Sequence, residues 1–427
     1  MIVAVVRDGQ LDTLRALLES MNVAPGRADP QAVLLPFAQF GTLHSARLVI
    51  LESGTPDDIR AYGYEPWPTR PSLALLGEID GDPDRFLAEL AVRAMPGLER
   101  LFACCERFVE RRGTLLEWMR SHAVPSAASY VNTRGRTVRR VHEEAALYRC
   151  LAGALPGLVA RHGRENALLL RRELLAHVEL ERHAGRLTLT PPSRTPWGWR
   201  LRDTVHLIGV PVLLLAALPF VLVASPFVLW RLRVRERRDP EINPRVEPGH
   251  VRELSALEDH DVTNPFDVFG DVKPGLFRRA LLSVVLLLVD YLARHVYNRG
   301  FLARVLTIHF ARWVWIEERR HLYFASVYDG SLDSYMDDFI NKVPFGLNLI
   351  FSHCVGYPTT RWAIKGGAEH EQEYKDTLRR AQLPSAVWYR AHPGMTARDM
   401  ARNAELRDGI ERRPTGIEAT RRWLALV

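Results

Sequence analysis

The sequence predicts an α+β protein made of two related modules, joined by a segment that enters a membrane. Two observations carry this prediction. The chain of 427 residues repeats itself, and between the copies the run Thr204–Trp230 contains no Asp, Glu, Lys or Arg. About 20 apolar residues suffice to cross the hydrocarbon core of a bilayer. We therefore expect a first module at 1–151, a helical linker at 152–261, a second module at 262–410 and a tail at 411–427.

The repeat is found by aligning the chain with itself. Its first block has six identities in eleven positions, and its second block aligns without a gap. Three blocks keep the same order in both copies, and they pair 42–52 with 307–317, 73–105 with 322–354, and 125–139 with 384–398. Because the blocks are collinear, we interpret the chain as a tandem duplication.

Each copy predicts the order strand, helix, strand, strand, helix, strand. Alternating or β-branched runs favour strands, and apolar residues at helical spacing favour helices. In the first copy we expect these elements near 2–7, 11–22, 45–52, 73–79, 84–104 and after 107, with further elements near 112–122, 127–132 and 137–151. This order is that of the ferredoxin-like βαββαβ fold, whose sheet has one uncovered face. Two such sheets in one chain are therefore expected to pack face to face.

The copies differ chiefly between their second and third strands. The first copy has twenty residues there, Ser53–Ser72, whereas the second has four, Glu318–His321. A long loop in one copy only is a candidate lid or partner contact, and a neutral surface loop is the alternative.

Composition limits the class of protein. With 47% apolar and 25% charged residues, long disordered stretches are not expected. The formal net charge of +7 comes mainly from arginine, and without a zinc-finger or basic helix-turn-helix pattern we do not expect nucleic acid as a partner. Met1–Arg7 is typical of a first strand rather than a secretory signal. No metal-ligand spacing joins the four cysteines, which we expect to be reduced cytosolic thiols: Cys104, Cys105, Cys150 and Cys354.

Tryptophans and arginines flank the uncharged run. Trp197, Trp199 and Trp230 bracket it as interfacial anchors would. Basic residues stand at both ends, namely Arg194, Arg200 and Arg202 before it and Arg231, Arg233, Arg235, Arg237 and Arg238 after it. A single span should favour one cytoplasmic side, and it would also keep the two copies apart on opposite faces of the membrane.

We therefore predict a re-entrant helical hairpin, about 204–217 and 220–231, that dips into the membrane from the cytoplasmic face. Pro219, near the middle of the run, favours a turn there. Membrane lipid is then the expected partner. A buried hydrophobic hairpin of a soluble protein is the alternative.

A Thr-x-His-x-Ala-Arg motif occurs in both copies, at His44/Arg47 and at His309/Arg312. A histidine at a strand start can serve as an acid, a base or a metal ligand. Because side chains alternate along a strand, His309 and Arg312 are expected to point to opposite faces. Presence in both copies favours a structural role.

An Asp-Gly pair also occurs in both copies, at Asp80 and at Asp329, where a strand turns into a helix. The Asp can cap the first helical turn while the Gly accepts a positive φ angle. The functional alternative is an Asp held at a pocket mouth for proton transfer.

His353 occurs in one copy only, opposite Cys104 in the first. Such asymmetry is expected of a functional residue, and a neutral imidazole could ligate haem iron. A helix cap or surface histidine is the alternative. The sequence has no Walker loop, nucleophile elbow, HExxH or CxxC.

The repeat units, with Asp-Gly after the hairpin, resemble the dimeric α+β barrel superfamily, which includes dye-decolourising peroxidases and chlorite dismutases. The resemblance implies haem between sheet and helices and an Asp in a Gly-x-x-Asp-Gly motif. Asp329-Gly330 is the nearest match in the second copy, with Ser326 in place of the first Gly, whereas the first copy has Gly77 three residues before Asp80.

Residues 258–410 also resemble a group of bacterial membrane-associated proteins of unassigned activity. The shared residues are Ile308–Trp313, Tyr328–Ser331, Ser334 and Tyr335. The chain departs from that group at Val327 and Leu332, where Asn and Trp are expected, and at His353, where Asn is expected.

Two functional hypotheses follow. The first is a membrane-associated, peroxidase-like oxidoreductase acting on an apolar or lipid-like substrate, with haem as cofactor. His309, Arg312 and Asp329 would be its catalytic residues, with Asp329 handling protons and Arg312 holding an anion or propionate; His353 would bind the cofactor. The second is a non-catalytic membrane-surface protein that binds a ligand or acts as a scaffold. Polar groups recurring in both copies favour the second, and the asymmetry at His353 and at 53–72 favours the first.

Overall fold

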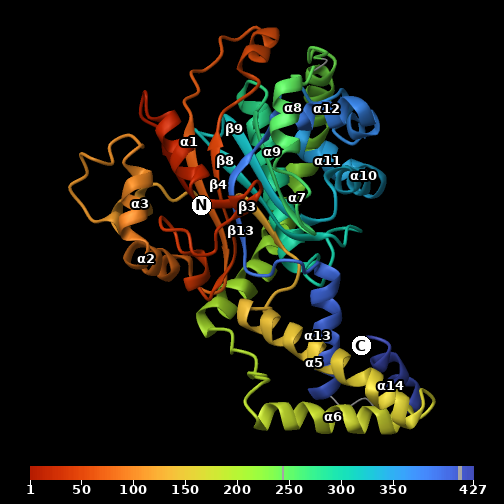
Figure 1. The fold of residues 1–427 in the computed structure, drawn as a ribbon. Helices are drawn as coiled ribbons and strands as arrows, with labels where there is room; N and C mark the ends of the chain where they lie inside the picture. The colour runs from red at the N-terminus through yellow and green to blue at the C-terminus, as the bar shows by residue number, and fades with distance from the viewer. Residues whose placement is uncertain (243–244, 412–415) are drawn as a thin grey trace. The chain divides into compact units, whose positions relative to one another are not determined.

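The computed structural model describes residues 1–242, 245–411 and 416–427, and its fold is mixed α+β (Figure 1). Residues 243–244 of the predicted linker and 412–415 of the predicted tail lie outside the described residues. The chain divides into two units. The larger contains the four-stranded and the five-stranded sheet and comprises Met1–Arg134 with Pro196–Ala391; the smaller is helical and comprises Gly135–Thr195 with His392–Val427.

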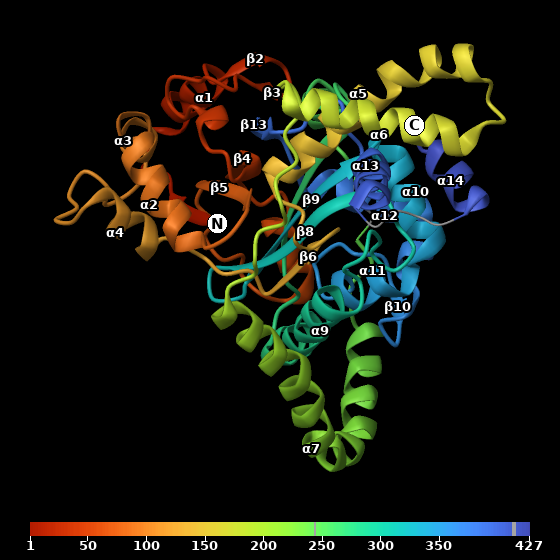
Figure 2. The same cartoon turned by 90° about the horizontal axis from the view of Figure 1, so that it is seen from below.

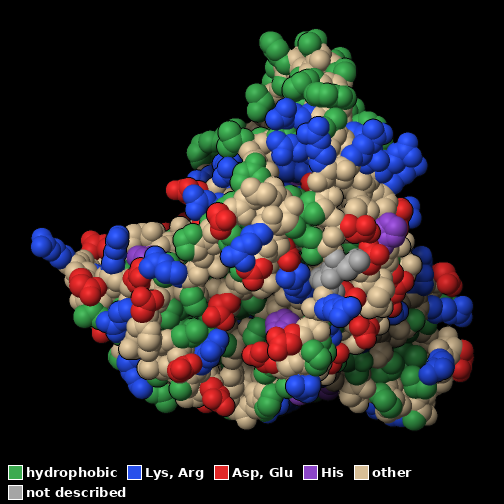
Figure 3. Space-filling view, turned by 90° about the horizontal axis from the view of Figure 1, so that it is seen from above, with side chains coloured by type: hydrophobic (Ala, Val, Ile, Leu, Met, Phe, Trp, Pro, Cys, Tyr) green, Lys and Arg blue, Asp and Glu red, His purple; other side chains and the backbone are tan. Residues whose placement is uncertain are grey.

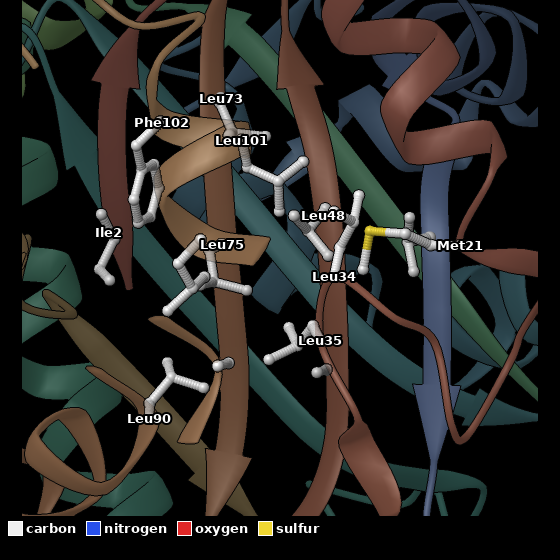
Figure 4. Packing of buried hydrophobic residues seen from close by; sticks show 14 of the residues in the cluster. Ile2, Met21, Leu34, Leu35, Leu48, Leu73, Leu75, Leu90, Leu101 and Phe102 are labelled. Atoms are coloured by element: carbon white, nitrogen blue, oxygen red, sulfur yellow. The ribbon is translucent and has the colours of Figure 1, made fainter. Parts of the chain in front are cut away.

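The first sheet is antiparallel and has the strand order β1-β5-β4-β13. Its strands are β1 (Ile2–Val5), β5 (Ser72–Ile79), β4 (Leu43–Leu51) and β13 (Ser385–Arg390). The associated helices and short strands are α1 (Leu11–Glu19), β2 (Asn22–Ala24), β3 (Arg27–Ala28), η1 (Phe37–Gln39), η2 (Pro56–Tyr62), α2 (Pro83–Arg93), α3 (Met95–Phe102) and α4 (Leu115–Ser121). Figure 4 shows Leu101 and Phe102 of α3 packed over strand residues Ile2, Leu73 and Leu75.

The second sheet is also antiparallel and has the order β12-β7-β9-β8-β6. Its strands are β12 (Gln382–Leu383), β7 (Thr263–Asp271), β9 (His321–Asp329), β8 (Ile308–Ile316) and β6 (Ala128–Val131). The remaining elements of this unit are α7 (Trp197–Glu236), α8 (Pro248–Ser255), α9 (Leu276–His295), α10 (Leu332–Lys342), α11 (Pro344–Phe351), β10 (Thr360–Arg361), β11 (Lys365–Gly366), η3 (Gly367–Glu369) and α12 (Glu371–Ala381). Side chains of α9, α10, α11 and α12 form one core with this sheet.

The two copies exchange a strand. The predicted strand at 127–132 of the first copy is β6, which pairs with β8 of the second copy, while β13 of the second copy pairs with β4 of the first. Tyr130 lies opposite Ala311, and the equivalent Tyr389 lies opposite Ala46. The small residue of each Thr-x-His-x-Ala-Arg motif therefore stands beside an incoming tyrosine, since cross-strand neighbours lie about 5 Å apart.

The sheets pack face to face, as expected. Alternate residues of β5 point to opposite sides, so Leu73 and Leu75 enter the helix-covered core while Ala74 and Leu76 face the other sheet. One buried cluster joins the two sheets and contains Val49, Leu51, Ala74, Leu76, Phe269, Val314, Ile316, Tyr323 and Ala325.

Two predicted elements of the first copy were wrong. The helix expected over 84–104 is two helices, α2 and α3, which meet at Ala94. Pro96 in the first turn of α3 lacks the amide hydrogen that a continuous helix would need there. No strand follows residue 107 before α4; only a bridge joins Val6 to Cys105.

The uncharged run lies in α7, which is helical over 40 residues and contains Pro211, Pro219 and Pro226. Near its start His206 Nδ1 lies 2.8 Å from His295 Nε2 at the end of α9, and near its end Arg231 stacks on Phe277 at the start of α9. Prolines bend helices, and Figure 2 shows α7 doubling back so that both of its ends meet α9. Instead of two separate helices at 204–217 and 220–231, one continuous, bent helix is present.

The helical unit contains α5 (Val138–His162), α6 (Ala167–His183), α13 (Ala397–Glu411) and α14 (Ile417–Leu424). Its core includes Leu151, Leu174, Leu406 and Trp423. The buried Arg407 Nη1 lies 3.1 Å from Glu143 Oε2, which compensates its charge inside this unit.

Candidate functional site

His309 and Asp329 are brought together at one end of the second sheet. His309 Nε2 lies 2.7 Å from Asp329 Oδ1, and Thr263 Oγ1 donates a hydrogen bond to the same oxygen at 3.0 Å. All three residues are buried. One carboxylate oxygen therefore joins the ends of β7, β8 and β9.

The same pair recurs in the first copy, where His44 Nε2 lies 3.0 Å from Asp80 Oδ1. The expected helix cap by these aspartates was wrong, because Asp82 Oδ1 accepts from the Asp84 amide and Ser331 Oγ accepts from the Ser334 amide. The glycines after both aspartates have the expected positive φ, +86° and +88°. Each Asp instead lies against its histidine.

The motif arginines point away from the histidines and cross to the opposite sheet. Arg47 Nη1 lies 2.9 Å from Asp267 Oδ1, and Arg312 Nη2 lies 2.6 Å from Glu78 Oε2. Arg47 is fully buried; burial lowers its pKa, but Asp267 outweighs that effect and the net pKa is raised. Each copy therefore contributes one arginine and one carboxylate to the layer between the sheets.

Tyr323 completes the network around Asp267. Its hydroxyl donates to Asp267 Oδ1 at 2.5 Å, and the Ser385 hydroxyl donates to the other carboxylate oxygen. Burial, with the adjacent carboxylate, raises the pKa of Tyr323 well above its ordinary value. The phenol is therefore a neutral hydrogen-bond donor.

The four residues singled out from the sequence do not form one pocket. Thr263, opposite Asp329, begins β7, and Asp271 ends it, so about 26 Å of strand separates its two ends. His353 is at the far end, where its carbonyl accepts from the Lys273 amide at 2.8 Å. The structure joins His309 to Asp329, but it places the Arg312 guanidinium in another layer and His353 at the other end of the sheet.

His353 is fully buried, so the alternative of a surface residue was wrong. Within the described residues neither ring nitrogen has a hydrogen-bond partner. Burial, together with Arg278 and Lys273, lowers the pKa of His353 well below its ordinary value. The side chain is therefore a neutral imidazole with unused donor and acceptor capacity.

Sequence reasoning missed a charged group around Asp271 and His321. His321 Nδ1 lies 3.1 Å from Asp271 Oδ1, and its Nε2 lies 3.2 Å from Glu317 Oε2. Although burial disfavours the cation, the two carboxylates raise the pKa of His321 to about 9. An imidazolium therefore stands between two carboxylates, which is favourable only because both are so close.

The 53–72 insert is attached to this group. Asp271 accepts hydrogen bonds from the Ser53 hydroxyl, from Thr55 Oγ1 at 2.6 Å and from Trp67 Nε1 at 3.0 Å. Three donors from the first copy thus satisfy one buried carboxylate of the second copy. No local spacing could have indicated this, since Thr55 and Asp271 are 216 residues apart.

The cavities differ in kind. Between β7, β9 and α12 lies an apolar cavity of about 30 Å³, lined by residues including Val268, Phe324 and Leu378. A groove of about 880 Å³, lined by both acidic and basic side chains, lies between α1 and α8. Ligand sites usually occupy roughly 300–1,000 Å³, so the groove has the volume of a ligand site and the apolar cavity does not. Among the described residues no cluster of three or more His, Cys, Asp or Glu could hold a metal ion.

Among the elements that the structure describes, α7 exposes the most large hydrophobic side chains. Its side chains are exposed over the whole apolar stretch, including Val205, Leu213, Phe220 and Val223. Figure 3 shows apolar side chains covering the projecting end and Lys and Arg side chains around its base. By length and composition this helix is able to cross or enter a membrane.

The chain matches no known protein-family model, no curated protein and no solved structure. The relationship to the dimeric α+β barrel superfamily therefore stays an expectation from the sequence. Function has to be inferred from the geometry of α7, of the paired motifs and of His353.

Proposed function

We propose that the protein is a monotopic membrane protein, which enters the bilayer from one face without crossing it. In this proposal the bent helix α7, which we call the arm, enters the membrane from the cytoplasmic face, and the two-sheet unit remains at the surface as a non-catalytic ligand-binding or scaffold module. The observation that carries the proposal is that both ends of the arm meet α9 while its apolar middle is exposed. Large exposed apolar patches are rare on soluble monomers and mark sites of protein or membrane contact.

The base of the arm is suited to an anionic membrane surface. Trp197 and Trp230 are exposed at its two ends, and exposed tryptophans favour the level of the lipid headgroups. The arginines flanking the arm add electrostatic attraction, worth about 1 kcal/mol each near an anionic leaflet. The apolar middle of the arm and the arginines at its two ends therefore favour the same orientation of the protein at the membrane, with the middle of the arm inserted and its ends at the headgroups.

The turn between β10 and β11 adds a second contact beside the arm. Glu236, the last residue of α7, accepts hydrogen bonds from the amides of Trp362 at 2.9 Å and Ala363 at 2.7 Å. Both residues have positive φ, which this carboxylate helps to hold. Trp362 and Ile364 are exposed, and the basic residues Arg361 and Lys365 flank them. We propose that this turn touches the same headgroups as the base of the arm.

The fold we propose for the two-sheet unit is two tandem ferredoxin-like modules that exchange a strand. The equal orders β1-β5-β4 and β7-β9-β8 support it. So do the equivalent bridges Val6 to Cys105 and Val272 to Cys354, which add the start of a fourth strand beside the first. In this fold the His–Asp and Arg–carboxylate pairs hold elements together in both copies, which supports a structural role for them.

Vesicle flotation tests the membrane proposal. We expect the protein to float with vesicles of phosphatidylcholine and phosphatidylglycerol, and Leu214→Arg with Leu222→Arg to abolish this. Each arginine at the centre of a membrane helix costs about 2.5–3.5 kcal/mol, so two predict a loss of binding on the order of 1,000-fold or more.

The control is Val33→Arg, the same kind of change at one exposed apolar residue outside the arm. Equal flotation of the arm variant and the wild type would contradict the proposal. Single cysteines at Val33 and Leu306 report on the two copies, and labelling from opposite sides of the membrane would show a span instead of a re-entrant arm.

A second candidate function is a peroxidase-like oxidoreductase acting on an apolar or lipid-like substrate. The observation that favours it is the buried, neutral His353, whose two ring nitrogens lack partners among the described residues. An absorption spectrum of protein made with ample haem precursor tests it. A Soret band that is lost in His353→Ala and kept in His309→Ala would support this function. A spectrum that shows protein absorption only would exclude haem as a cofactor.

A further inference from the structure

Two buried cations share one carboxylate at the base of the arm. Lys273 Nζ lies 2.9 Å and Arg278 Nη2 lies 2.5 Å from the same oxygen, Asp239 Oδ2. The side chains of Lys273 and Arg278 are only 6% and 2% exposed, whereas Asp239 is 14% exposed. The group therefore has one positive charge in excess, and its carboxylate is on the more accessible side. An uncompensated buried charge costs several kcal/mol.

Unused hydrogen-bonding groups surround these cations. Arg278 Nε and Nη1 and both nitrogens of His353 are buried and have no partner within the described part of the chain. The Lys273 amide donates to the His353 carbonyl at 2.8 Å, and Lys273 and Arg278 share the Asp239 oxygen. Burial first, and then these two cations, lower the pKa of His353. Each buried group left without a partner costs about 1–3 kcal/mol. Because the arginine atoms only donate, the missing partner is an acceptor.

The cluster lies where the arm joins the rest of the two-sheet unit. Asp239 stands three residues beyond α7, and Arg278 is in the first turn of α9, the helix that meets both ends of the arm. The start of α9 has no side-chain cap, and a helix N-terminus favours an anion. Burial and then the Asp239 carboxylate raise the pKa of Tyr62, so this phenol of the insert is neutral.

We propose that Lys273, Arg278 and His353 form a binding site for a phosphate-type oxyanion, which displaces the Asp239 carboxylate. Guanidinium and ammonium groups are the usual partners of phosphate, and the neutral imidazole adds one N–H donor. The phosphate of a lipid headgroup and inorganic phosphate share this chemistry. Only the lipid source rests on the proposed membrane function.

The test is Asp239→Asn, which keeps the size of the side chain but removes the competing charge. We expect this variant to bind inorganic phosphate at least about 10-fold more tightly than the wild type, because a negative charge about 3 Å from both cations is removed. Its midpoint of thermal unfolding should rise with phosphate but not with chloride at equal ionic strength. Titration calorimetry and thermal unfolding in detergent, without vesicles, measure both effects.

Asp203→Asn is the matched control. Asp203 also serves two arginines, lying 3.3 Å from Arg134 and 2.9 Å from Arg294, but all three side chains are more than 20% exposed. It stands at the other end of the same arm. Because both variants replace an aspartate by asparagine, the change in net charge is identical. We expect this variant to bind phosphate no more tightly than the wild type does, and an equal gain in phosphate binding in both variants would overturn the site.

Phosphorus NMR of inorganic phosphate gives a second measurement on the wild-type protein, so the test does not depend on the folding of Asp239→Asn. If the wild-type protein broadens the phosphate resonance and Arg278→Gln does not, the site is supported. If the wild-type protein causes no broadening at millimolar phosphate, the site is overturned. A water-soluble, short-chain phosphatidylglycerol that competes with phosphate identifies the lipid source, whereas phosphate binding without such competition identifies free phosphate. Failure of vesicle flotation alone would leave these phosphate results standing.

Discussion

Replacing Arg47 by methionine is expected to lower the free energy of unfolding of the two-sheet unit by about 3–5 kcal/mol. The change leaves Asp267, which is fully buried, without its cation. It also removes the hydrogen bond from Arg47 Nη2 to the Ser326 carbonyl, which joins the two sheets. Thermal and urea unfolding of the detergent-solubilised protein, followed by tryptophan fluorescence, measure the loss.

The internal repeat supplies the control for this prediction. Arg312→Met is the same change at the equivalent position, but Arg312 and Glu78 are 17% and 11% exposed and water can solvate the orphaned carboxylate. We expect less than half of the loss seen at Arg47. Arg47→Met combined with Asp267→Leu should recover part of the stability, because no unpaired charge remains. Equal losses at the two arginines would show that burial does not set their contribution.

Raising the pH from about 7 through 9 is expected to destabilise the protein by about 2–3 kcal/mol through His321. The folded-state pKa of His321, about 9, is above the ordinary value of 6.5. A raised pKa means that the stabilisation is fully present below pH 6.5 and is lost as pH rises through 9. The midpoint of thermal unfolding, measured from pH 6 to 10, reports this slope.

His321→Gln should remove that pH dependence, since glutamine cannot carry the charge that Asp271 and Glu317 stabilise. Trp67→Phe is the control, because it removes one donor to Asp271 but keeps the imidazolium and both carboxylates. It should lower stability at every pH and keep the slope. A slope that persists in His321→Gln would mean that a different group titrates.

Sequence comparison within the chain predicted the local structure well, because equal residues recur in equal roles. His44 with Asp80 and His309 with Asp329 form the same pair, and Ala46 and Ala311 each lie beside an exchanged tyrosine. The exchange itself could not be predicted. An alternating strand pattern fixes which face a strand buries, but not which of two similar edges it joins.

The polar groups were predictable only where they repeat. The histidine at 353 was singled out by its asymmetry, yet nothing in its neighbourhood indicated that it would be buried beside Lys273 and Arg278. The Asp271 group was missed because its donors come from an insert that exists in one copy. Contacts between distant segments depend on the assembled fold, and no local spacing encodes them.

The exchanged strands also set an order for biosynthesis. When β4 has left the ribosome, its outer edge has to wait for β13, which begins at Ser385, more than 300 residues after Leu51. At about 5–20 residues per second, that edge is open for roughly 15–70 s. An unpaired strand edge readily pairs with other chains. The nascent first copy is therefore exposed to pairing with other chains during this time, and neither half of the chain is expected to yield a soluble domain when expressed alone.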